Sequence, residues 1–186
     1  MKRIFDIILS LILIGIFTVP IFLIYILIRF DSKGSPIHWS KRIGKNKKIF
    51  NMPKLRTMFI NTPQIETNKL MGIKKRITKI GYTLRKFSLD ELPQIYLVLS
   101  GKMSFVGPRP ALYNQKFLIN KREKMGIHSL KPGITGLAQV NGRDDISLHK
   151  KISYDLTYLN KHNFFYDLKI IVKTIYVVFK QKDILH

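Results

Sequence analysis

The sequence predicts an α+β protein, mostly α-helical, with a single domain behind an N-terminal membrane helix. A stretch of 22 residues without charge, residues 7–28, lies near the start of the chain. Several later segments carry apolar residues at helical spacing. Residues 131–142 alternate glycine with Ile, Leu and Val, which is typical of a tight β-hairpin. At 186 residues the chain can bury one real core.

The chain carries a large excess of positive charge. Lysine and arginine together number 33 against 11 aspartate and glutamate residues, a formal net charge of +22. Such an excess opposes a compact monomer unless something anionic lies nearby. Nucleic acid, anionic lipid headgroups and phosphorylated substrates all qualify. The absence of cysteine excludes a thiol nucleophile and a cysteine-ligated zinc ion.

The uncharged residues 7–28 predict a membrane segment, because one helix of this length measures roughly 33 Å and can cross a bilayer core. The segment is too long for a signal peptide, and no small-residue cleavage site follows it. Basic residues flank it on both sides, beginning with Lys2 and Arg3 before it and Arg29 after it. Because basic flanks prefer the cytoplasm, this pattern favours a segment whose two ends lie on the same side.

A proline inside the apolar segment indicates where the chain would turn back. Pro20 removes the hydrogen bond to the Ile16 carbonyl group, and Thr18 can offer its hydroxyl to the freed backbone groups. We therefore expect residues 1–30 to form a re-entrant membrane helix, a hairpin broken near Thr18 and Pro20. A straight transmembrane span is the alternative. Residues 31–186 would form one cytosolic, membrane-associated domain.

The cytosolic part is predicted to be mainly helical, with amphipathic helices at the membrane interface. Residues 37–58 are expected as short strands or extended loops, and 61–68 as a loop. Helices are predicted for residues 73–87, 89–99, 111–125 and 164–179. In the last helix Lys169, Lys173 and Lys180 share one side, which suits a helix on the membrane surface. An ordinary core-packing helix fits equally well, and both interpretations stay open.

Two adjacent carboxylates, Asp90 and Glu91, lie among many lysines and arginines. One explanation is purely structural, because Ser88 with Glu91 three residues later matches a capping box. Whether the helix starts at Ser88 or at Asp90, Asp90 lies at its N-terminus. This position favours the anionic form of Asp90 and offers backbone N–H groups to a phosphate. Spacing alone leaves the structural and the catalytic interpretations open.

A second segment holds one arginine between two prolines. Pro108 and Pro110 restrict the backbone around Arg109, so that its conformation costs little entropy. A rigidly held guanidinium group is a good fork for phosphate oxygens. A stiff loop with a solvated arginine would give the same pattern.

Four segments together resemble the bacterial sugar transferase family, the monotopic polyprenyl-phosphate phosphoglycosyl transferases. They are residues 54–58 (KLRTM), 88–94 (SLDELPQ), 106–110 (VGPRP) and 132–143 (PGITGLAQVNGR). Their order and spacing fit the family from about Lys2 to Lys182. One motif would be weak, whereas four in order are highly specific. With nothing ahead of the apolar segment, the chain resembles the small single-domain form.

The resemblance implies a catalytic domain that transfers a sugar-1-phosphate from a UDP-sugar to polyprenyl (undecaprenyl) phosphate and releases UMP. Asp90 matches the nucleophile, which forms a covalent phosphosugar-aspartate intermediate, and is expected as a direct ligand of Mg²⁺. Glu91 matches the partner carboxylate, which helps with metal binding or proton handling. The cations expected to bind phosphates or uridine are Lys54, Arg56, Arg109 and Arg143.

The same resemblance implies where the protein works and with what. Its setting would be the bacterial inner membrane, with the active site on the cytoplasmic face among anionic lipids. Nucleic acid is not expected as a partner, and a homo-oligomer stays open. Three departures from the family bear on donor preference or hairpin geometry: Leu55 replaces a commoner aromatic residue, Lys102 replaces an acidic one, and Val19 separates Thr18 from Pro20.

Two other functions compete with this interpretation. A basic membrane adaptor that only binds anionic lipid would show no turnover. A nucleic-acid-binding protein would not need the long apolar segment. The histidines lack metal-ligand spacing, and the second acidic pair, Asp144 and Asp145, is expected in a solvated loop rather than at a metal.

Overall fold

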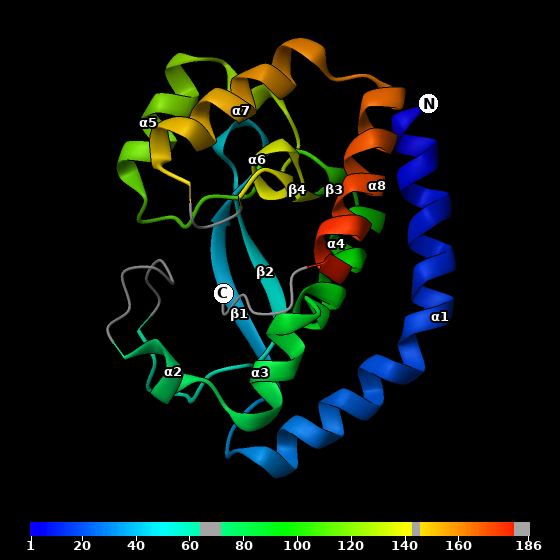
Figure 1. Cartoon of the computed structure of the whole chain (residues 1–186), viewed down its shortest axis with the longest axis vertical. Helices are drawn as coiled ribbons and strands as arrows, with labels where there is room; N and C mark the ends of the chain where they lie inside the picture. The colour runs from blue at the N-terminus through cyan, green and yellow to red at the C-terminus, as the bar shows by residue number, and fades with distance from the viewer. Residues whose placement is uncertain (64–71, 143–145, 181–186) are drawn as a thin grey trace.

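A long N-terminal helix flanks the rest of the molecule in the computed structural model, which describes residues 1–63, 72–142 and 146–180 (Figure 1). This helix, α1 (Lys2–Asp31), contains Pro20. Figure 1 shows α1 bent part way along, as expected of an internal proline. The Thr18 hydroxyl donates a hydrogen bond to the Ile14 carbonyl oxygen at 2.6 Å. Thr18 and Pro20 therefore lie within one continuous, bent helix, and its re-entrant path through a bilayer stays a prediction.

The outer face of α1 is apolar and exposed. Only 6% of its most apolar 18-residue window is buried, and the helix is long and apolar enough to cross a membrane. The exposed side chains include Ile4, Ile8, Leu11, Ile12, Ile16, Val19, Phe22 and Leu23. An apolar face of this kind is not stable in water, so we expect lipid to cover it.

The antiparallel hairpin of the molecule lies directly after α1. Strands β1 (Ile37–Ile43) and β2 (Ile49–Leu55) pair so that Ile37 faces Leu55 and Ile43 faces Ile49. A short 3-10 turn, η1 (Lys45–Lys47), connects them. The prediction of short strands within residues 37–58 is therefore confirmed, and this segment supplies the small β-hairpin of the fold.

The hairpin predicted at residues 131–142 is wrong. Strand β4 (Gly133–Thr135) pairs in parallel with β3 (Ser104–Val106), and the chain then enters the short helix α6 (Leu137–Val140). The glycines serve close backbone approach rather than a turn. A Cβ atom on Gly133 would lie 2.2 Å from the backbone nitrogen of Gly107, which is far too close.

The remaining elements are short helices and two longer ones. The predicted helix 73–87 is divided into α2 (Ile73–Arg76) and α3 (Lys79–Lys86), because Thr78 starts a new helix by accepting a hydrogen bond from the Gly81 N–H. The segment 89–99 is a 3-10 helix, η3 (Leu89–Gln94), followed by α4 (Ile95–Leu99). The others are α5 (Lys116–Lys124), η4 (Ile127–Ser129), α7 (Leu148–Lys161) and α8 (Phe164–Lys180).

The main core lies between the inner face of α1 and the elements that carry the four motifs. Its buried residues come from β2, α4, β3, α6, α7 and α8 and include Met52, Val98, Met103, Val106, Val140, Tyr158 and Ile170. Leu9, Leu13 and Ile14 of α1 pack against this cluster. Burial of this apolar surface helps to hold α1 to the rest of the chain.

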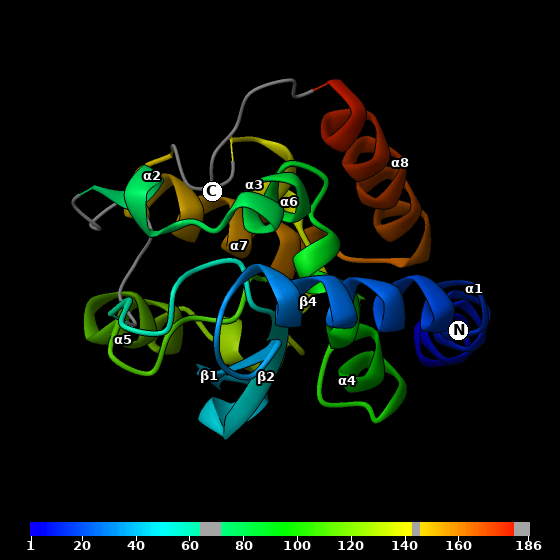
Figure 2. The same cartoon turned by 90° about the horizontal axis from the view of Figure 1, so that it is seen from below.

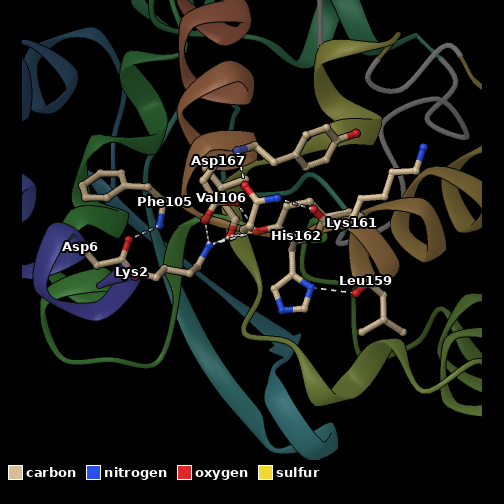
Figure 3. A network of polar contacts seen from close by, with 11 residues as sticks. Lys2, Asp6, Phe105, Val106, Leu159, Lys161, His162 and Asp167 are labelled. Carbon is tan, nitrogen blue, oxygen red and sulfur yellow. Dashed lines mark hydrogen bonds and ion pairs between the residues drawn. The ribbon is translucent and has the colours of Figure 1, made fainter.

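A polar network also fastens the beginning of α1 to β3 and α8 (Figure 3). The Lys2 ammonium group donates to the Val106 carbonyl oxygen at 2.9 Å and to the Tyr158 hydroxyl oxygen at 3.0 Å, and it forms an ion pair with Asp167. The Tyr158 hydroxyl donates to Asp167 at 2.6 Å. Asp6 accepts from the Phe105 N–H at 3.2 Å. Helix α1 is therefore bonded to the strand that leads into the Pro108–Pro110 segment.

Helix α8 packs one side against the core, and its contact with a membrane surface stays a prediction. Its buried residues Asp167 and Ile170 face the core, whereas Phe165, Val172 and Ile175 are exposed. Figures 1 and 2 show the start of α8 beside the start of α1, where the rings of Phe5 and Phe164 are 5.5 Å apart. The exposed apolar side chains of both helices suit contact with a membrane.

Candidate active site

The two adjacent carboxylates lie on η3, directly after a sharp turn. Ser88 has φ 56°, in the left-handed region, and its side chain makes no capping hydrogen bond. The capping-box interpretation is therefore wrong, because the left-handed backbone of Ser88 is not the extended conformation of a capping residue. The turn at Ser88 instead directs the chain from α3 into η3.

Glu91 is held by two cations. Its Oε1 accepts a hydrogen bond from Lys54 Nζ at 2.7 Å and from Arg109 Nη2 at 2.8 Å. Burial on its own would raise the pKa of Glu91, but the charges and hydrogen bonds of Arg109 and Lys54 outweigh it and hold the pKa well below its usual range. Glu91 is therefore an ionised, firmly positioned anion.

Asp90 lies in a different environment. The residue is 7% exposed, and its Oδ2 lies 3.5 Å from Lys54 Nζ, a long contact. Burial raises the pKa of Asp90, and the neighbouring charge of Glu91 adds to this, while Lys54, Arg85 and Arg109 act in the opposite direction. Of the two carboxylates, Asp90 is the one whose negative charge is less compensated, as suits a nucleophile.

A buried ion pair fixes the loop that carries Arg109. Arg122 donates to the Arg109 carbonyl oxygen at 2.8 Å and binds Asp155 Oδ2 through Nε and Nη2 at 2.9 and 2.6 Å. Arg122 and Asp155 are 4% and 2% exposed. The loop is rigid, as the two prolines predict, and the Arg109 side chain is bound to Glu91 rather than solvated.

Arg56, another predicted cation, is not among the described residues that line the cavity at Glu91, although it lines a neighbouring cavity together with Asp90. Arg56 is buried, and its guanidinium group binds the carbonyl oxygens of Ser32 and Lys33 at 2.7 and 2.6 Å, where it fastens the chain that leaves α1. Substrate binding by Arg56 stays a prediction. Arg143 lies outside the described residues, as do Asp144 and Asp145. Lys102, the departure noted above, is exposed.

A cavity of about 330 Å³ opens beside the carboxylates. Lys54, Asp90, Glu91 and Arg109 all line it, so the structure brings together four of the predicted site residues. It also contributes residues that the sequence analysis missed: Arg42, Arg85, Arg122, Gln139 and Lys151. Gln139 lies inside the fourth motif, so the motif itself could have indicated it as a site residue. The contributions of Arg42, Arg122 and Lys151 follow from tertiary contacts alone.

The fold and this site define a bacterial sugar transferase. The family model described as bacterial sugar transferase matches residues 1–181, and the chain belongs to this family. It is therefore an enzyme that transfers a sugar-containing group, and the resemblance seen in the four motifs is confirmed.

Several relatives are similar in sequence over almost the whole chain. A Bacillus subtilis protein named uncharacterized sugar transferase EpsL is 39% identical, over 94% of this chain and 85% of its own length. The exopolysaccharide production protein ExoY of Rhizobium meliloti is 36% identical, over 94% of this chain and 83% of its own. The UDP-glucose:undecaprenyl-phosphate glucose-1-phosphate transferase of Klebsiella pneumoniae is 37% identical over 98% of this chain. The chain spans only 41% of that last relative, and also 41% of an uncharacterized sugar transferase of Haemophilus influenzae.

Proposed function

We propose that this chain transfers a sugar-1-phosphate from a UDP-sugar to polyprenyl phosphate, with release of UMP. The observation that carries the proposal is the buried Asp90–Glu91 pair, in which Lys54 and Arg109 neutralise Glu91 and leave Asp90 comparatively uncompensated. The name of the Klebsiella pneumoniae relative describes this type of transfer for glucose-1-phosphate.

In the first step, a carboxylate oxygen of Asp90 attacks the phosphorus atom that bears the sugar. The bond between this phosphorus and the oxygen that bridges the two phosphates breaks, and UMP leaves with the electron pair. The product is an acyl phosphate on Asp90. Lys54, Arg85 and Arg109 surround the site with positive charge, which offsets the approach of an anionic nucleophile to an anionic substrate.

In the second step, a phosphate oxygen of the polyprenyl phosphate attacks the same phosphorus atom. The acyl phosphate bond breaks, the Asp90 carboxylate is regenerated, and the product is a polyprenyl diphosphate sugar. Because Glu91 is already ionised and bound by Lys54 and Arg109, its role is to hold these cations near Asp90. Two displacements at one phosphorus need a nucleophile that is held firmly, as the rigid η3 turn allows.

The residues around Asp90 fit a magnesium ion. Nowhere in the described ranges do three or more His, Cys, Asp or Glu side chains gather. Mg²⁺ is commonly held by one or two carboxylates together with substrate phosphates and water, so Asp90 and Glu91 would be sufficient protein ligands. When bound, the ion would supply positive charge at the phosphate oxygens.

The proposed location is the cytoplasmic face of the bacterial inner membrane. The apolar outer faces of α1 and α8 support contact with lipid, and the cationic surface supports contact with anionic headgroups. At this level a soluble nucleotide-sugar and a lipid-anchored phosphate can both reach Asp90.

The variant Asp90→Asn tests the proposal. With Mg²⁺, undecaprenyl phosphate and a panel of UDP-sugars, we expect UMP release to fall on the order of 10³-fold or more, because the nucleophile is lost. The wild-type protein incubated with donor labelled in the sugar-bearing phosphate should retain label on the peptide that contains Asp90.

The matched control is Glu123→Gln, which also removes a carboxylate. Glu123 lies on α5, half exposed, where it pairs with Lys47, far along the chain from the site. This variant should keep the wild-type turnover. Unchanged UMP release by Asp90→Asn would refute the nucleophile, and a wild-type protein without turnover on any donor would favour the alternative of a basic lipid-binding adaptor.

A further inference from the structure

Two cavities meet at Asp90. The first, described above, has a volume of about 330 Å³, and the second has about 300 Å³. Asp90, Lys54 and Arg85 line both of them, together with Arg42 and Leu112. Asp90 therefore lies at a junction that can be reached from two sides.

The first cavity is amphipathic. Its lining includes the cations Arg109, Arg122 and Lys151, and also the apolar side chains Leu13 of α1 and Val178 of α8. These are the two helices with exposed apolar outer faces. A cavity lined both by cations and by apolar side chains of these two helices fits a phosphate that carries a long hydrocarbon chain. We call it the amphipathic cavity.

The second cavity is basic and rich in hydroxyl groups. Its walls come from the β1–β2 hairpin and the segment that follows, and no described residue of α1 or α8 lines it. Among the described residues, four cations (Arg42, Lys54, Arg56 and Arg85) and one carboxylate, Asp90, line it. Four hydroxyl-bearing residues do so as well: Ser35, Ser40, Thr57 and Thr62. We call it the basic cavity.

Two further features of the basic cavity point to a polyanionic ligand. Arg56 is 6% exposed, and its Nε atom has no hydrogen-bond partner although the atom is buried. An unsatisfied buried donor is costly, and a ligand oxygen would satisfy it. Phe59, which also lines this cavity, is 50% exposed and can stack against a planar ring.

We propose that the basic cavity binds the nucleoside diphosphate part of the donor, whereas the amphipathic cavity holds the hydrocarbon chain of the acceptor phosphate. This inference rests on the proposed function and adds where each substrate lies. The charge, the hydroxyl groups and the exposed aromatic ring of the basic cavity match a nucleotide. The apolar side chains that α1 and α8 contribute to the other cavity match a polyprenyl chain.

The stereochemistry of phosphoryl transfer limits how far the two sites are separate. In each displacement the attacking and leaving oxygens lie roughly in line through phosphorus. The acceptor oxygen must therefore enter at the position that the UMP oxygen has left, opposite the Asp90 oxygen. The two phosphates share one position at the junction, near Lys54 and Arg85, while the nucleoside and the hydrocarbon chain extend into different cavities.

A pair of cavity-filling variants tests this arrangement. Thr62 lines only the basic cavity and Val178 only the amphipathic cavity. Thr62→Trp should raise the KM for the UDP-sugar about tenfold or more and slow the release of UMP in the absence of acceptor. Val178→Trp should raise the KM for undecaprenyl phosphate by a similar factor. The assignment is wrong if Thr62→Trp acts on the acceptor KM, or if Val178→Trp acts on the donor KM.

A measurement on the wild-type protein covers the case in which a tryptophan variant does not fold. Photo-crosslinking with 4-thiouridine monophosphate and Mg²⁺, followed by peptide mapping, should label the peptides of β1, β2 and residues 56–63. Label on α5, α7 or α8 would overturn the cavity assignment. Label on the hairpin without turnover of any UDP-sugar would leave the assignment standing and refute the proposed function, so the two failures are distinguishable.

Discussion

At the scale of single residues, two neighbouring carboxylates differ because their partners differ. Glu91 accepts hydrogen bonds from Lys54 and Arg109, whereas Asp90 has only the long contact to Lys54. Burial raises the pKa of Asp90, and the two cations lower that of Glu91. Glu91 thus serves as an anchor for two cations, and Asp90 is left available for the reaction that we propose.

This difference predicts a shift in the pH profile of Lys54→Met. The reactive form of Asp90 is the carboxylate, so activity is lost as the pH falls through its pKa. Lys54 lowers the pKa of Asp90, so its removal should raise this pKa and move the acidic limb of UMP release to higher pH. Lys54→Arg keeps the charge and should leave the limb nearly in place. An acidic limb that moves to lower pH in Lys54→Met would contradict this assignment.

At the scale of elements, the first turn of α1 is part of the scaffold of the site. Lys2 binds the carbonyl group of Val106, the last residue of β3, and Arg109 follows three residues later. The ring of bonds among Lys2, Tyr158 and Asp167 is partly buried and joins α1, α7 and α8 (Figure 3). Helix α1 and the Arg109 loop are thus parts of one bonded unit.

Lys2→Met should destabilise the protein by about 1–3 kcal/mol, because it leaves the buried Asp167 carboxylate without its cation. Unfolding of the detergent-solubilised protein measures this loss. UMP release should also fall, while fractionation should still find the protein in the membrane. In the double variant Lys2→Met with Asp167→Asn, part of the stability should return, since the uncompensated charge is gone. Strictly additive losses would show that the pair is not coupled.

At the scale of the whole molecule, both ends of α1 contact the part of the chain that follows it. The first turn binds β3 and α8 through Lys2, and the chain after the last turn is held by Arg56 through Ser32 and Lys33. A straight span would place its ends on opposite sides of the membrane. The contacts at both ends therefore favour the re-entrant path, which is not yet tested.

The absence of cysteine makes this path measurable. A cysteine placed ahead of Met1 or in Lys33→Cys would be the only thiol of the chain. We expect a membrane-impermeant maleimide to label both in inverted vesicles, whose cytoplasmic face is outward, and neither in intact spheroplasts. Labelling of one position from each side would show that α1 spans the membrane.

Local patterns in the sequence were sufficient for several features. The apolar helix, the strands within residues 37–58, the helix 164–179 and the four motifs were predicted correctly, because each depends on residues close together in the chain. The family resemblance also pointed to Lys54 and Arg109, and the structure places both against Glu91, whereas their binding of substrate stays a prediction. The family itself follows from the order of its motifs.

Tertiary structure alone decided the rest. The parallel pairing of β3 with β4 depends on glycines that let two backbones approach. The sequence does not reveal this pairing, because glycines in a tight turn would give the same pattern. Arg56 and Arg109 look alike in sequence, yet one binds the chain after α1 and the other binds Glu91. The contrast between Asp90 and Glu91 arises from cations that lie 18 to 37 residues away in the chain. Near neighbours determine helix and strand, whereas the charge state and the partners of a buried side chain depend on contacts that form only when the chain folds.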